Sequence, residues 1–163
     1  MPRAAGSRAL AALGACTLAV LGACDRDAPQ PAARIATAEV AGTVLSVAVP
    51  SGRRAVAIPA GLVLGLEKAG ARRRIDAMTL ELGRDAAGVS FDQVRGTGAA
   101  AIRYGVVRSP GGSGGDEVTL VAERRCADAI VTLHFATQVE EPEAPDLEAA
   151  FAVLAGARCS SGR

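Results

Sequence analysis

The sequence predicts an α+β domain, an antiparallel β-sheet meander followed by one amphipathic helix packed on the sheet. Between residues 43 and 139, several runs alternate apolar and polar residues, the period of strands buried on one face. Near the C-terminus, the spacing changes to i, i+3, i+4 and i+7, which is one stripe of a helix. The chain has no internal repeat. We therefore expect a single domain over residues 38–163.

The N-terminus has the pattern of an export signal. Arg3 and Arg8 precede an uncharged run from Ala9 to Ala23. This run is shorter than the roughly 20 residues of a membrane-spanning helix and fits the core of a signal peptide. We therefore assign residues 1–23 to a signal peptide.

The apolar run ends in Leu21-Gly22-Ala23-Cys24, which resembles a bacterial lipobox. This resemblance predicts that Cys24 is lipidated, which would make the chain a membrane-anchored lipoprotein of the periplasm. An earlier Cys16 stands in the same context, but cleavage there would leave too short an apolar core. The alternative is an ordinary secreted protein with Cys24 as a free thiol. Asp25 does not decide between the inner and the outer membrane.

A short tether is expected between the anchor and the domain. Residues 24–37 are polar, rich in alanine and interrupted by Pro29 and Pro31. A segment of this composition packs little apolar surface and behaves as a flexible spacer.

Composition argues against several classes of partner. Removing Arg3 and Arg8 from the 18 basic residues leaves 16 against 17 acidic ones, so nothing favours nucleic acid or anionic lipid. The membrane contact is therefore expected through the lipid anchor alone. Tryptophan is absent, and few aromatic rings are present to stack bases or sugars: Phe91, Tyr104, Phe135 and Phe151.

Cys126 and Cys159 are the two cysteines that remain besides Cys24 after cleavage. In an oxidising compartment such a pair predicts a disulfide, and two buried free thiols are the alternative. No Cys or His lies two to four residues from either one, so the spacing does not indicate a metal site.

The first strands are expected in a β-hairpin. Leu45, Val47 and Val49 share one face of a strand from Thr43, and a turn at residues 50–53 leads to a second strand with Val56 and Ile58. Residues 61–70 fit either a strand or a short helix. Residues 91–97 give no clear pattern.

The remaining strands follow the same alternation. Residues 75–82 form one, residues 101–108 the next, and a Gly-rich loop at 110–115 leads to a return strand that ends near Cys126. The clearest strand places Val131, Leu133, Phe135, Thr137 and Val139 on one face.

The final helix carries Leu147, Ala150, Phe151 and Leu154 on its apolar stripe. Pro145 suits its first turn, while Asp146 and Glu148 suit its positive N-terminal end. Gly156 and Arg158 mark its end, and Cys159 follows.

No catalytic, metal or cofactor site is predicted. His134, the only histidine, lies mid-strand, and the chain has no Gly-x-Ser-x-Gly turn for a hydrolase nucleophile. The loop at 113–117 lacks the Gly-Lys-Ser/Thr ending of a phosphate-binding loop. Residues 138–143 with Asp146 form the densest acidic cluster. A solvated lead-in to the helix, a partner-facing patch and a calcium site all remain possible there, although the oxygen spacing does not match an EF-hand.

Four features, in order, resemble immunity lipoproteins of the type VI secretion system. They are Ser46-Val47-Ala48-Val49-Pro50-Ser51-Gly52; the stretch from Tyr104 to Ser113-Gly114-Gly115-Asp116-Glu117 with Leu120; Gln138-x-Glu140; and Pro145-Asp146-Leu147. The resemblance covers most of residues 43–158. It implies a PsbP-like α+β fold and a toxin partner, a periplasmic muramidase effector that cleaves peptidoglycan.

We therefore predict a non-enzymatic lipoprotein that binds this effector and blocks its substrate groove. The contact residues expected from the resemblance lie in the Gly-rich loop and the acidic segment: Ser113, Gly114, Gly115, Asp116, Glu117, Gln138, Glu140 and Glu141. The resemblance implies no metal site in this chain. The alternative is an envelope lipoprotein that serves as a non-catalytic binding or assembly module.

Overall fold

The structure is a computed structural model that describes residues 34–67, 76–83, 90–111, 115–139 and 144–162. These residues belong to one compact unit, Ala32–Arg163. The signal peptide, Cys24, the Arg72-Arg73-Arg74 run and most of the expected tether lie outside the described residues. Among the described residues, no helix is long and apolar enough to cross a membrane.

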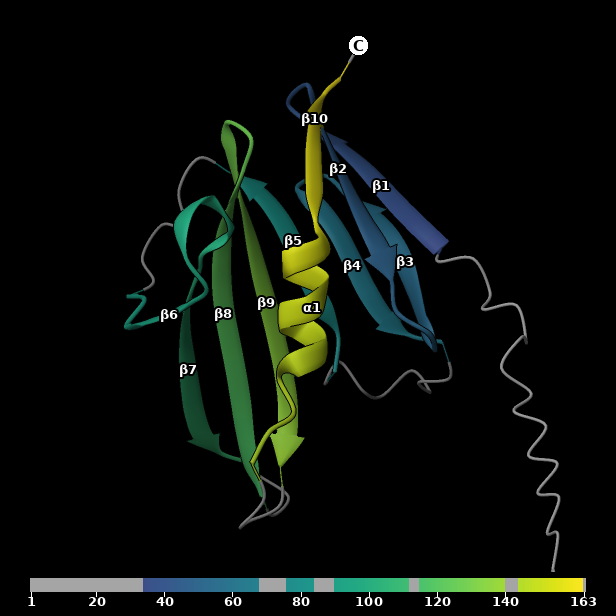
Figure 1. Ribbon diagram of the computed structural model, residues 1–163. Coiled ribbons are helices and arrows are strands. Elements are labelled where there is room, and N and C mark those ends of the chain that lie inside the picture. Colours follow the sequence, from purple (N-terminus) through teal and green to yellow (C-terminus); the bar gives the residue numbers. More distant parts are fainter. Residues whose placement is uncertain (1–33, 68–75, 84–89, 112–114, 140–143, 163) are drawn as a thin grey trace, which may run out of the picture. The chain divides into compact units, whose positions relative to one another are not determined.

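The unit is α+β and mostly β, with two antiparallel sheets and one α-helix (Figure 1). The larger sheet has the order β3-β4-β5-β9-β8-β7-β6, and the smaller one β1-β2-β10. The strands are β1 Arg34–Val40, β2 Thr43–Val49, β3 Arg53–Ile58, β4 Gly61–Leu66, β5 Met78–Gly83, β6 Gln93–Arg95, β7 Ile102–Pro110, β8 Asp116–Cys126, β9 Ala129–Val139 and β10 Arg158–Ser161. The helices are a 3₁₀ turn, η1 Gly98–Ala100, and α1 Glu148–Gly156.

The smaller sheet departs from the predicted single meander. β1 and β2 form a hairpin around Ala41 and Gly42, both of which have positive φ. β1 includes residues 34–37, which we expected in the tether, because the strand pairs along its full length with β2. On its other side β2 pairs with β10, a four-residue strand that was not predicted from the sequence.

The predicted hairpin between residues 43–49 and 56–58 is wrong in its pairing. The turn is present, since the Arg53 N–H donates to the Pro50 carbonyl at 3.2 Å. However, β2 belongs to the smaller sheet and β3 begins the larger one, where it pairs with β4. Alternation within a strand reports which face is buried, and it carries no information about the neighbouring strand.

The strands predicted near residues 75–82, 101–108, 118–126 and 131–139 are confirmed, and the structure decides the segment at 61–70 that fitted either a strand or a helix. Residues 61–66 form a strand and not a helix, with Leu62 and Leu64 buried. β5 buries Met78 and Leu80, as its alternation predicts. β7 and β8 pair around the Gly-rich loop, and β9 buries its predicted apolar face.

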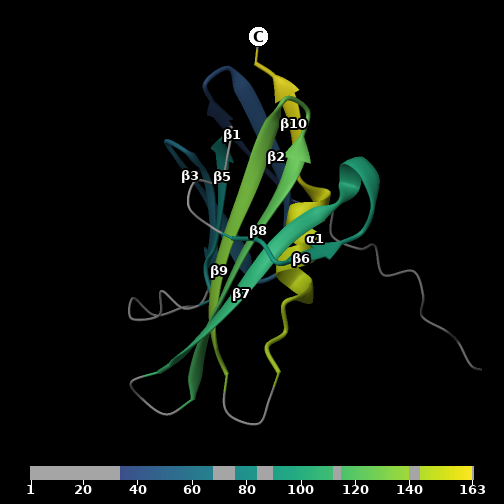
Figure 2. The ribbon, with the colours of Figure 1, turned by 90° about the vertical axis from the view of Figure 1, so that its left-hand side faces the viewer.

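Helix α1 packs against β2 of the smaller sheet and against β8 and β9 of the larger one. Figure 2 shows it on one side of the larger sheet. Its buried residues include the predicted Ala150, Phe151 and Leu154, together with Val153. At its C-terminal end the Arg124 guanidinium, from β8, donates to the carbonyls of Ala155 and Ala157. A cation there complements the helix dipole and satisfies carbonyls that lack partners in the helix.

One hydrophobic core joins the two sheets and the helix. Its fully buried side chains come from every layer: Leu45 and Val47 of β2, Leu62 and Leu64 of β4, Met78 and Leu80 of β5, Leu120 of β8, Val131 and Leu133 of β9, and Leu154 of α1. Burying a side chain of this size contributes about 1.5–3 kcal/mol. The smaller sheet is therefore an integral part of the fold.

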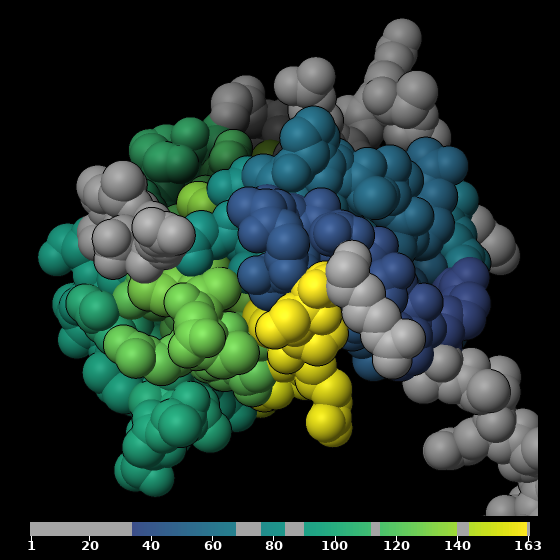
Figure 3. Space-filling model, turned by 90° about the horizontal axis from the view of Figure 1, so that it is seen from above, coloured from purple at the N-terminus to yellow at the C-terminus, as the bar shows by residue number. Residues whose placement is uncertain are grey.

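A disulfide joins Cys126, the last residue of β8, to Cys159 of β10, with the Cα atoms 5.6 Å apart. This is the pairing that we favoured over two free thiols. It links the larger sheet covalently to the smaller one. Figure 3 looks onto this end of the unit and shows β10, in yellow, beside the green β8–β9 strands and the blue β1–β2 hairpin.

Candidate functional site

The predicted contact residues that the structure describes lie together at one end of the larger sheet. Gly115 directly precedes β8, Asp116 and Glu117 begin it, and Gln138 is near the end of β9. The register places Asp116 opposite Val139 and Glu117 opposite Gln138. We call this the hairpin end, formed by the tip of the β7–β8 hairpin, residues 138–139 and residues 144–146. Ser113, Gly114, Glu140 and Glu141 lie outside the described residues.

The hairpin tip is closely packed around a glycine. The Gly111 N–H donates to the Gly115 carbonyl at 2.9 Å. A Cβ at Gly111 would lie 2.6 Å from that carbonyl oxygen and 3.2 Å from the Gln138 side-chain nitrogen, so only glycine fits without a shift. This contact brings the tip of the hairpin against the end of β9.

The two acidic residues of the tip, Asp116 and Glu117, differ in how freely they can contact a partner protein. The Asp116 carboxylate lies 3.4 Å from the Arg108 guanidinium, and its side chain is only 23% exposed. Glu117 is exposed and forms no ion pair with any described residue. Glu117 is therefore the charge at this tip that is most available to a partner.

A hollow of about 380 Å³ adjoins the tip, between the end of β9 and the segment before α1. Its polar lining comes from Arg53, Asp76, Thr137, Gln138 and Asp146. Except for Gln138, these residues were not among the predicted contact residues. The hollow is large enough for a side chain of a partner protein.

Arg53 and Asp76 fix one wall of this hollow. The Arg53 guanidinium donates to the Leu64 carbonyl at 3.1 Å and also to the Asp76 carbonyl. The Thr137 hydroxyl donates to the Asp76 carboxylate at 2.8 Å. Asp76 has a φ of 75°, a conformation that costs free energy for any residue with a Cβ. The contacts on both sides hold it there.

Burial lowers the pKa of Arg53, while the nearby Asp76 carboxylate acts in the opposite direction. The ordinary pKa of arginine is so high that the guanidinium stays charged at neutral pH. The wall thus presents one cation beside one carboxylate, and Asp146 adds a second carboxylate to the lining.

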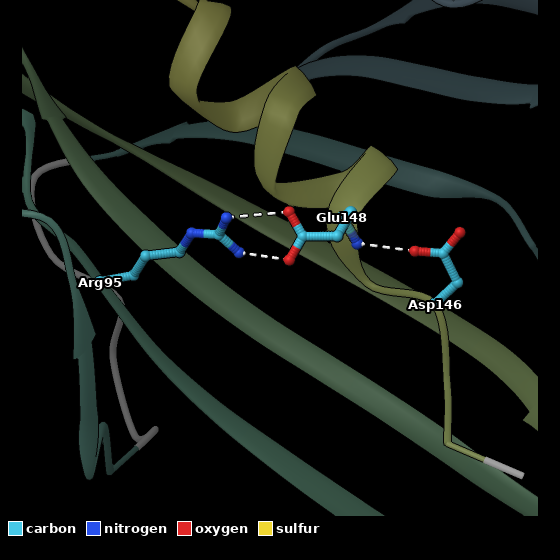
Figure 4. Close-up of polar contacts among 3 residues, drawn as sticks. All are labelled: Arg95, Asp146 and Glu148. Carbon is cyan, nitrogen blue, oxygen red and sulfur yellow. Dashed lines mark hydrogen bonds and ion pairs between the residues drawn. The ribbon is translucent and has the colours of Figure 1, made fainter. Parts of the chain in front are cut away.

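The segment before α1 is positioned by a second set of contacts, shown in Figure 4. The Glu148 N–H donates to the Asp146 carboxylate at 3.0 Å, in agreement with the predicted role of Asp146 at the start of the helix. The Arg95 guanidinium donates to both carboxylate oxygens of Glu148, at 2.6 and 2.8 Å. It also lies 4.8 Å from the centre of the Phe151 ring.

This second set holds β6 against the helix. Phe151 in turn meets Tyr104 edge to face, with ring centroids 5.0 Å apart. Such aromatic and cation–π contacts each contribute about 0.5–1.5 kcal/mol. The cluster joins β6 and β7 to the start of α1 and has no arrangement typical of catalysis.

His134 lies in the middle of β9, opposite Thr79 of β5 and Val121 of β8. It is half-buried and distant in register from the hairpin end. Across the ranges that the structure describes, no group of three or more His, Cys, Asp or Glu side chains is placed to hold a metal ion.

Comparison with known proteins adds one finding. The family model described as the Type six secretion immunity 3 domain matches residues 46–158. The match begins in β2 and ends at the first residue of β10, so it includes the hairpin end and α1. No curated protein matches the sequence significantly.

Proposed function

Because this chain belongs to the type six secretion immunity 3 family, we propose that it neutralises a cell-wall-degrading effector of the muramidase class. Membership of the family makes it a type VI secretion immunity protein and implies a toxin effector as its partner. The family match, over more than half of the chain, is the observation that carries this proposal.

The proposed mechanism is steric. A rigid sheet presents the hairpin end to the effector, and the tip of the β7–β8 hairpin enters the groove in which the effector binds its glycan substrate. Glu117 and Gln138 stand side by side at this end, next to the hollow lined by Arg53 and Asp76. Loops carried by a rigid scaffold are common binding elements. No bond needs to be made or broken in this mechanism.

The proposed location is the periplasm, with the chain held to a membrane by a lipid on Cys24. The leader and its Leu21-Gly22-Ala23-Cys24 ending support this location. The Cys126–Cys159 disulfide agrees with it, because such bonds persist in oxidising compartments. The arrangement of one helix against an antiparallel sheet also agrees with the proposed PsbP-like fold.

Rescue of growth tests the proposal. The full chain should protect cells that express its muramidase effector, sought among the toxins encoded near it, when that effector is directed to the periplasm. The control is the same effector directed to the cytoplasm, away from peptidoglycan. A chain that fails to rescue growth, although it is exported and folded, would rule out the proposed function.

A pull-down distinguishes immunity from assembly. The full chain, tagged after Arg163, is purified from mixed envelope and secreted fractions. The Gly162 N–H donates to the Gly42 carbonyl in the β1–β2 turn, and Figure 1 shows the C-terminus at the end of the unit opposite the arrowhead of β7, so the tag leaves the site free. A muramidase recovered in equimolar amount supports the proposal. Recovery of envelope assembly proteins alone would support an assembly module.

A further inference from the structure

We propose that the outer edge of β7, from Gly105 to Ser109, binds an extended segment of the effector as an added β-strand. This inference rests on the proposed function, because it describes how the same partner is held. It concerns a surface separate from the hairpin tip, although the two are continuous along β7.

In the described part of the chain, this side of β7 is unpaired over more than half of its length, and the Ser90 carbonyl lies next to it at Gly105. β7 has nine residues, and β6 pairs only with Ile102, Arg103 and Tyr104. Beyond Tyr104, no strand in the described part of the chain pairs with this side of β7. Figure 2 shows the short β6 beside the start of β7, which continues past it.

The register shows which backbone groups face outward. The β8–β9 turn has two residues, so Cys126 and Ala129 form a hydrogen-bonded pair across it. The N–H and C=O groups of successive residues in a strand point to alternate sides of that strand. Counting back from Cys126, every second residue of β8 therefore directs these groups to β9, and the residues between them direct theirs to β7. The backbone N–H and C=O of Val107, which lies opposite Thr119, therefore point toward β8.

It follows that Val106 and Arg108 direct their N–H and C=O groups away from β8, to the open side. The pairing of β6 agrees with this assignment, because Gln93 lies opposite Tyr104, two residues before Val106. Two outward pairs of donors and acceptors, one on every second residue, match the repeat of an extended polypeptide backbone.

The side chains of this edge do not prevent strand addition. Val107 is 64% exposed, Val106 is 36% exposed, and Val94 of β6 is 64% exposed. Edge strands of soluble proteins are usually protected by charge, proline or irregular backbone. On β7 the protecting residues Arg108 and Pro110 lie toward the hairpin tip, so the unprotected part of this edge is at Val106 and Val107.

A strand of the effector is the occupant that these features favour. Its backbone would pair with Val106 and Arg108, and an apolar side chain would cover Val107. Arg108 is ion-paired with Asp116 but keeps 47% of its side chain exposed, so it can also contact an acidic residue on the incoming strand. The edge runs directly into Pro110 and the hairpin tip, so one partner reaches both surfaces.

Two proline variants of the full chain test the edge. In Val106→Pro the lost N–H faces outward, so no pairing with β8 is lost. The matched control is Ala57→Pro, at an exposed position of the other edge strand, β3. The turn between Ile58 and Gly61 also has two residues, so by the same reasoning the N–H of Ala57 faces away from β4. The probe is the effector recovered with the wild-type chain. We expect Val106→Pro to raise the Kd at least about tenfold and Ala57→Pro to leave it unchanged.

Amide hydrogen exchange of the wild-type chain gives a second measurement that needs no variant. Val107 should be protected with and without the effector, whereas Val106 and Arg108 should gain protection only in the complex. If the wild-type chain binds the effector but neither the proline nor the exchange pattern shows involvement of the edge, this inference is wrong and the proposed function stands. If Val106 becomes protected as the free chain is concentrated, the occupant is a second copy instead. If the wild-type chain binds no effector, both the proposed function and this inference are wrong.

Discussion

Arg95 and Glu148 form a two-point ion pair between an edge strand and the first turn of the helix, with N···O distances of 2.6 and 2.8 Å. β6 has only three residues and pairs with three residues of β7, so it has few other contacts to hold it. The same guanidinium covers Phe151. This pair therefore couples the position of β6 to that of α1.

Because of this ion pair, we expect the free energy of unfolding to depend on pH in the acidic range. Hydrogen bonding to Arg95 lowers the pKa of Glu148 in the folded chain below the value of about 4.3 of an unfolded glutamate. A lowered folded-state pKa stabilises the fold above about pH 4.3, and this contribution is lost as the pH falls through the folded-state pKa. Both side chains are well exposed, so we expect a small effect.

The measurement compares urea unfolding midpoints of wild type and Glu148→Gln at pH 7 and pH 3. The variant should be less stable at pH 7 and should approach wild type at pH 3. Glu117→Gln, at an exposed glutamate without an ion pair to any described residue, is the control and should show no such convergence. A difference for Glu148→Gln that is equal at both pH values would contradict the role of the ion pair.

Removing the disulfide should destabilise the unit strongly. Cys126 and Cys159 are 33 residues apart, and closing a loop of this size stabilises the folded state by about 3–4 kcal/mol in the chain-entropy model. We expect the double variant Cys126→Ser/Cys159→Ser to lose about this much free energy of unfolding in urea titrations. Its amide exchange should rise first in β10, which pairs with β2 over only four residues. Loss of less than about 1 kcal/mol would show that packing alone fixes β10.

Asp76 should tolerate asparagine better than alanine. Its φ of 75° disfavours alanine, while asparagine both adopts this conformation and keeps an oxygen to accept the Thr137 hydroxyl. We expect Asp76→Ala to cost about 2 kcal/mol of unfolding free energy and Asp76→Asn less than about 1 kcal/mol. Equal losses in urea titrations would argue against backbone strain at this position.

Charge reversal at the two ends of the larger sheet should affect effector binding differently. Glu117→Arg changes the exposed charge at the hairpin end, and Asp128→Arg changes an exposed charge in the turn at the opposite end of β8. We expect Glu117→Arg to weaken effector binding about tenfold, and Asp128→Arg to leave it unchanged, as measured by calorimetry. Equal affinity of both variants would place the contact away from the hairpin end.

The sequence indicates the strands better than it indicates the sheets. The alternation around Leu45, Leu80 and Leu133 is sufficient to identify their strands, whereas the run around Leu64 fits a short helix as well. The separation of β2 from β3 depends on which distant strand covers each edge, and no neighbouring residue records it. β6 and β10 have three and four residues, too few for a period to be visible.

For the candidate site as well, the sequence predicts the local elements but not the contacts between distant ones. A hairpin brings its tip to a fixed end of the sheet, so the predicted loop at 113–117 and the end of the next strand meet there by topology. Arg53 and Asp76 are 23 residues apart, and their contact arises only because β3, β4 and β5 pair in sequence. Residues of that kind carry no local signal.

The smaller sheet also constrains the order in which the protein can be completed. Its central strand, β2, lies near the beginning of the compact unit, and one of its two partners, β10, lies more than a hundred residues later. Pairing over such a separation is slow, because a long chain must close before any contact forms. Until β10 has been synthesised, β2 has an unpaired edge on the side that β10 later occupies. The smaller sheet therefore has all three of its strands only after β10 has paired with β2.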